Sequence, residues 1–133
     1  MTESTAPSKL LTAIAKITAE QAATPLAQRQ GMCLHYTRIG LAEAGVTIPQ
    51  TATAYECYQA IAADPAKYGL KSVAIVGGKP SVTPCIEFWK PPVGHQYGHI
   101  GIVNGGEIYS AVNYRLAGEF VEPANVAGAF VLA

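Results

Sequence analysis

The spacing of hydrophobic residues predicts a helix near the start of the chain. Leu10, Ile14 and Ile17 recur at the interval of an amphipathic helix, and Ser8 can cap the helix start. Pro25 closes off the Ala-rich continuation. We therefore expect a surface helix with one buried stripe.

Two further helices are predicted from boundary signals. The segment from Gly31 to Gly45 is bounded by glycines and has apolar positions at helical spacing, with Cys33 in its first turn. Thr53 and Glu56 have the spacing of a capping box, which indicates a helix start. Pro65 should end this third helix, because a proline disfavours helical geometry in the residue before it.

Beyond Tyr68 the pattern changes to alternating, β-branched residues separated by glycine and proline. The predicted strands contain Val73 and Ile75, Cys85 to Trp89, Ile100 to Val103, Ile108 to Tyr109, and Phe130 to Leu132. Helices followed by strands, with no regular alternation of the two, are typical of an α+β domain with an antiparallel sheet.

Composition and charge narrow the classes of function. The chain has 133 residues, 50% of them hydrophobic, which fits one domain over residues 1–133, with residues 1–8 expected to be flexible. Nine basic residues balance nine acidic ones, so neither nucleic acid nor an anionic membrane surface is expected as a partner. No apolar run approaches the ~20 residues that span a bilayer, and residues 1–8 lack a secretory pattern, so we expect synthesis in the cytoplasm.

Cys33 is the candidate nucleophile. A thiol attacks as thiolate, and the first turn of a helix stabilises an anion through its unpaired backbone donors and positive dipole end. At ~100° per residue, Cys33 shares a helix face with Tyr36, Thr37, Gly40 and Ala44. These mostly small side chains predict close approach to a sheet, with the sulfur pointing at it.

His99 is the candidate base. His35 is nearer in sequence, but it lies roughly 200° around the helix from Cys33 and leaves on the opposite side. His99 begins a strand, and if Ile100 and Ile102 face one side, then His99 and Gly101 face the other. The missing side chain at Gly101 would leave room for a helix or a substrate beside His99.

The third group that would orient the imidazole has two candidates. Residues 104–107 have the pattern of a two-residue hairpin turn, and counting back from it places His99 opposite Val112. Ser110 then shares the face of His99, whereas Asn113 faces away unless a bulge intervenes. Asn113 is the better chemical choice, because its amide oxygen accepts an imidazole proton more securely than a hydroxyl does. Both remain open.

A zinc site is the alternative use of these residues. Thiolate and imidazole are zinc ligands, and Cys33, His35, His95 and His99 would supply them. The helix geometry separates Cys33 from His35, so we expect no metal and no other cofactor.

Short motifs around Cys33 and His99 resemble those of a known family. Gly31 to Cys33, Tyr36 to Val46 and Tyr97 to Val103 are similar to the NlpC-type and CHAP cysteine peptidoglycan hydrolases, and to the small amidase effectors of type VI secretion. The resemblance implies a papain-like α+β fold, with N-terminal helices and the nucleophile helix packed on an antiparallel sheet. The third position of the NlpC pattern falls on Ser110, and the CHAP amide falls on Asn113.

The resemblance also implies a function. The chain would cleave amide bonds in the peptide stems of bacterial peptidoglycan through an acyl-enzyme on Cys33, with His99 moving the proton. Among the aromatic residues that could line a groove, we expect Tyr97 alone to face the wall polymer. The chain would reach the wall as a phage lysin or as an exported effector with an immunity protein. The alternatives are a non-catalytic wall-binding or virion structural module of the same fold and a thiol acyltransferase.

Overall fold

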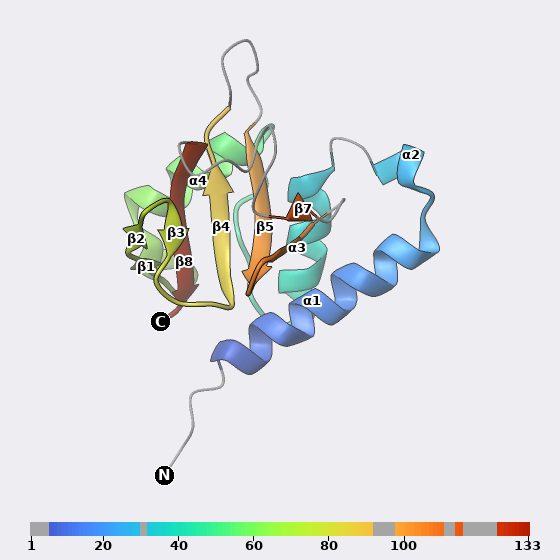
Figure 1. Cartoon of the computed structure of the whole chain (residues 1–133), viewed down its shortest axis with the longest axis horizontal. Helices are drawn as coiled ribbons and strands as arrows, with labels where there is room; N and C mark the ends of the chain where they lie inside the picture. Colours follow the sequence, from blue (N-terminus) through green and yellow to red (C-terminus); the bar gives the residue numbers. More distant parts are fainter. Residues whose placement is uncertain (1–5, 30–31, 92–97, 111–113, 116–124) are drawn as a thin grey trace.

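The structure is a computed structural model that describes residues 6–29, 32–91, 98–110, 114–115 and 125–133 (Figure 1). Its helices are α1 (Ala6–Ala23), α2 (Leu26–Arg29), α3 (Cys33–Glu43) and α4 (Ala54–Ala63), followed by the 3₁₀ helix η1 (Pro65–Tyr68). Its strands are β1 (Leu70–Val73), β2 (Ile75–Val76), β3 (Lys79–Pro80), β4 (Cys85–Trp89), β5 (His99–Asn104), β6 (Glu107–Tyr109), β7 (Tyr114–Arg115) and β8 (Val126–Leu132).

The predicted helices are confirmed. Helix α1 begins at Ala6, ahead of the cap expected at Ser8. Helix α4 begins with the predicted capping box, in which Glu56 N donates to Thr53 Oγ1 at 3.1 Å and Thr53 N donates to Glu56 Oε1 at 3.1 Å. The short helix α2 was not predicted. Within the described residues, no helix has the length and apolarity needed to cross a bilayer.

The main sheet is antiparallel and has the strand order β1-β8-β4-β5-β6-β7. The last strand, β8, therefore lies between β1 and β4 (Figure 1). Val73 and Ile75, predicted as parts of one strand, are divided between β1 and the separate β2-β3 hairpin. Inserting β8 gives β4 a partner on each side, so β4 is a central strand and all its residues are buried.

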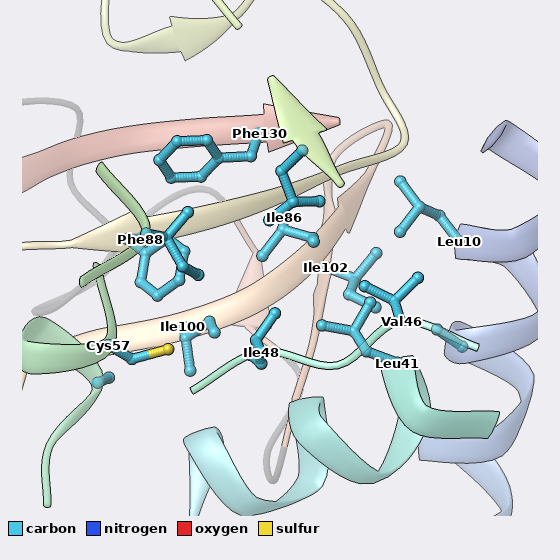
Figure 2. Close-up of a cluster of buried hydrophobic side chains, with 14 of the residues drawn as sticks. Leu10, Leu41, Val46, Ile48, Cys57, Ile86, Phe88, Ile100, Ile102 and Phe130 are labelled. Carbon is cyan, nitrogen blue, oxygen red and sulfur yellow. The ribbon is translucent and has the colours of Figure 1, made fainter. Parts of the chain in front are cut away.

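Each face of the sheet contributes to a different apolar cluster. The face that carries Ile100 and Ile102 packs against α1, α3 and α4, and Figure 2 shows these side chains opposite Leu41 and Ile48. The strand residues of this cluster also include Ile86, Phe88 and Phe130. The opposite face carries a second cluster of Cys85, Trp89, Val103, Ile108 and Ala129. The predicted alternation along β5 is therefore confirmed, with His99 on the second face.

Gly40 serves helix packing, which corrects the prediction that the small residues of α3 allow close approach to the sheet. A Cβ at Gly40 would lie 2.7 Å from Ala13 O and 2.7 Å from Ile17 Cγ1, both on α1. The close neighbour at this position is thus another helix. The contact between α1 and α3 fixes the direction in which α3 carries Cys33 toward the sheet.

Replacing Gly40 by alanine should destabilise the protein by about 1–3 kcal/mol, because the added methyl group overlaps backbone and side-chain atoms of α1. Alanine favours an isolated helix over glycine by about 1 kcal/mol, so a net loss can only come from packing. Urea denaturation measures the change. The matched control is Gly106→Ala, where a Cβ meets nothing within 4 Å. A Gly40→Ala variant more stable than the parent would contradict this packing.

Candidate active site

The thiol of Cys33 lies where the start of α3 meets strand β5. Cys33 is the first residue of α3 and is half-buried. Its sulfur is hydrogen-bonded to the backbone amide of Ile100 on β5, and the amides of Leu34 and of Cys33 itself also favour the thiolate. Burial outweighs these donors and raises the pKa of the Cys33 thiol above its ordinary value of 9.0. The resting group is therefore a neutral thiol.

His99 is the first residue of β5 and is held in the layer on the other side of the sheet. Only 5% of its surface is exposed. Trp89 lies directly opposite on β4, with the two ring centroids 5.5 Å apart. Burial lowers the pKa of His99 to about 4, because the charged imidazolium loses its hydration. At neutral pH the ring is uncharged and able to accept a proton.

The structure brings Cys33 and His99 to the same end of β5. The sulfur contacts the backbone of Ile100, and His99 is the neighbouring residue. Along the described residues, β6 pairs with β5 from Ile102 to Asn104. The sulfur thus meets β5 ahead of the segment that pairs with β6. The helix α3 packs on the face of the sheet that carries Ile100, whereas the His99 side chain belongs to the opposite face.

Gly101 has a different neighbour from the one predicted, and this is a second correction. A Cβ at Gly101 would lie 2.6 Å from Ile108 Cγ2 and 3.5 Å from Ser110 Cβ. The room beside Gly101 is therefore taken by side chains from β6 and the residue after it, on the face away from α3. The glycine allows these side chains to lie close to β5 beside His99.

The hairpin register that underlies the third-group prediction is confirmed. Asn104 pairs with Glu107 and Ile102 pairs with Tyr109, as the two-residue turn requires. Ser110 is fully buried on the face that carries His99, and its carbonyl accepts a hydrogen bond from Gln21 Nε2 at 2.6 Å. The alternative third group, Asn113, lies outside the described residues, as do the substrate-facing Tyr97, His95 and Val112.

Of the other thiols, Cys57 belongs to the apolar cluster against which Cys33 packs, and Cys85 belongs to the cluster on the opposite face of the sheet. His35 is exposed and packs edge-on against Tyr36. Cys57 and Cys85 are fully buried, and burial raises the pKa of each thiol to about 12. Within the described ranges, no three His, Cys, Asp or Glu residues are placed to hold a metal ion.

Glu87 is a buried residue of this region that was not predicted as a site residue. This carboxylic acid is in the middle of β4 and is only 1% exposed, and burial raises the pKa of Glu87 to about 7. It lies on the face of Trp89 and directly opposite Gly101. The sequence signal for Glu87 is an acidic residue inside an apolar strand, because glutamate is rarely buried unless it has a partner.

The fold and the position of Cys33 together indicate the fold class. A thiol at the start of a helix that packs on an antiparallel sheet is the arrangement of a papain-like α+β fold, which confirms the predicted fold class. No protein-family model and no curated protein matches the chain.

Among solved structures, the chain is similar to one in the type VI native effector–immunity complex Tae3-Tai3 from Ralstonia pickettii. The TM-score is 0.65 at 19% sequence identity, over 92% of this chain and 96% of that one.

Alkylation should distinguish the three thiols. In the native protein, iodoacetamide should modify Cys33 and leave Cys57 and Cys85 intact, because only Cys33 is partly exposed. The rate at Cys33 should keep rising as the pH increases beyond 9, since burial keeps this thiol protonated at neutral pH. Peptide mass spectrometry after timed quenching measures both. A rate that levels off below pH 7 would instead reveal a thiolate already formed at rest.

Proposed function

We propose that this protein is a cysteine hydrolase that cleaves amide bonds in the peptide stems of bacterial peptidoglycan. The observation that carries the proposal is the placement of the Cys33 sulfur on the backbone amide of Ile100, next to His99. A thiol and an imidazole brought to one end of one strand support a nucleophile and a base for acyl transfer. The likeness of the fold to a chain of a type VI effector–immunity complex supports the choice of substrate.

The protonation states favour a mechanism that starts from a neutral pair. His99 takes the proton of Cys33 as the sulfur attacks the stem-peptide carbonyl, and the backbone amide of Cys33 donates to the oxyanion. His99 then gives the proton to the leaving amine, which departs and leaves an acyl group on the sulfur. Water, deprotonated by His99, releases the acid and restores the thiol. A neutral imidazole is the form needed in both half-reactions.

The same comparison favours the exported effector over the phage lysin. The similar chain belongs to a complex of an effector with its immunity protein. An effector that attacks peptidoglycan endangers the cell that makes it, so a partner that binds and blocks it would be required. We therefore propose that the natural partner is an immunity protein and that the hydrolase itself acts on the wall after delivery.

Cleavage of purified peptidoglycan tests the proposal. The parent protein should release soluble muropeptides with a newly freed carboxyl group, detected by mass spectrometry. Cys33→Ala should lower the rate by roughly a thousandfold or more, since it removes the nucleophile, and His99→Ala should do the same by removing the base.

His35→Ala is the matched control, because this exposed histidine lies on the helix that carries Cys33. It should keep the parent rate. If Cys33→Ala and His99→Ala digest the wall as fast as the parent, the hydrolase proposal is wrong. Wall binding without release of fragments would point to the non-catalytic module.

A further inference from the structure

Buried polar side chains gather on one face of the main sheet. In the described part of the chain, the buried polar residues are Thr37, Glu87, His99 and Ser110. All but Thr37 lie in the layer that also holds Trp89, on β4, on β5 and directly after β6. Burying a polar group costs free energy, and a cluster of such groups in an otherwise apolar layer is typical of a functional site.

Glu87 is at the centre of this polar cluster. Within the part of the chain that the structure describes, neither of its carboxylate oxygens has a hydrogen-bond partner, and the same holds for Trp89 Nε1. The residues directly opposite Glu87 are small on both sides, Gly101 on β5 and Ala129 on β8. A long side chain between two small neighbours can swing toward either strand.

His99 is the diagonal cross-strand neighbour of Glu87. Trp89 lies directly opposite His99. Glu87 is two residues before Trp89 on β4, so the two side chains are on the same face of the sheet. Diagonal neighbours have Cα atoms roughly 7–8 Å apart, a separation that glutamate and histidine side chains can bridge. The carboxyl group of Glu87 is therefore within reach of the imidazole.

Among the described residues, burial alone accounts for the raised pKa of Glu87. The titratable groups that face it are Cys85 on its own strand and His99 on β5, and Glu87 contributes to the raised pKa of Cys85. The apolar members of this layer come from β1, β2, β5, β6 and β8, and they are Val73, Ile75, Val103, Ile108, Val126, Ala129 and Val131. Of Cys85 and His99, only His99 can become a cation.

We propose that Glu87 is a positioning residue for His99, whose carboxylate receives the imidazole N–H and balances the charge that His99 gains when it takes the proton of Cys33. The proposal rests on the proposed hydrolase function for its catalytic meaning. Without a counter-charge, an imidazolium in this dry layer is strongly disfavoured, as the lowered pKa of His99 shows. With Glu87 ionised, the thiol proton moves to His99 and the new positive charge is paired.

The ionisation of Glu87 then sets the pH at which the site becomes active. Burial raises the pKa of Glu87 to about 7, so the carboxylate forms as the pH passes through neutrality. Below this range Glu87 is neutral and offers no counter-charge to His99. Activity should therefore rise with pH around 7, on a limb that belongs to Glu87 and not to His99.

Nuclear magnetic resonance of the full chain with ¹⁵N-labelled histidine tests the coupling without substrate. The imidazole signals of His99 should show a titration step near pH 7, where Glu87 ionises. The step should be lost in Glu87→Gln and kept in Glu43→Gln, a matched change at an exposed carboxylate of α3. An unchanged His99 titration in Glu87→Gln overturns the proposal.

A second measurement needs no substitution in β4. In the parent protein, the ¹³C carboxyl signal of Glu87 and the His99 signals should share one midpoint near neutral pH, and separate midpoints overturn the proposal.

In wall cleavage, Glu87→Gln should lose the rising limb near pH 7 and lower kcat/KM about tenfold through kcat. Because the resonance tests use no wall, they succeed or fail independently of the proposed hydrolase activity.

Discussion

The site depends on one contact between distant segments, the hydrogen bond from the backbone amide of Ile100 to the sulfur of Cys33. It joins the first residue of α3 to the start of β5, and so it brings the thiol to the residue that follows His99 in the chain. The packing of α3 against α1 at Gly40 and against the sheet through Leu41 holds the helix in the direction this contact requires. A backbone donor is a durable partner for a nucleophile, because no side-chain substitution removes it except proline.

Burial shifts the pKa values of the candidate nucleophile and the candidate base in opposite directions. Burial raises the pKa of Cys33 and lowers that of His99, so both are neutral at rest. A thiolate–imidazolium pair is already charged before the reaction, whereas this pair is neutral. Charge appears only when the thiol reacts, and the layer around His99 must then accommodate a cation. A buried carboxyl group such as Glu87 is suited to that need, since it too is neutral until its proton is lost.

Local signals made much of the fold predictable. The capping box at Thr53 and the hairpin turn after Asn104 fix backbone geometry within a few residues, and both were read correctly. The predictions that were wrong concern residues whose neighbours come from distant segments of the chain. The uses of Gly40 and Gly101 depend on which element covers them, and no local pattern reveals that β8 enters between β1 and β4. Glu87 carries a local signal, an acidic residue inside an apolar strand, but its position opposite Gly101 and Ala129 depends on how the strands are ordered.

The central claim is that the Cys33 sulfur lies on the Ile100 amide, and the ¹H–¹⁵N resonance of that amide tests it most directly. The Ile100 signal should move strongly in Cys33→Ala, and in the parent it should titrate with the thiol above pH 9. The Val103 amide, on the same strand but in the second cluster, should stay in place. If the Ile100 amide responds to neither change, then the thiol does not reach β5 and the account of the site is wrong.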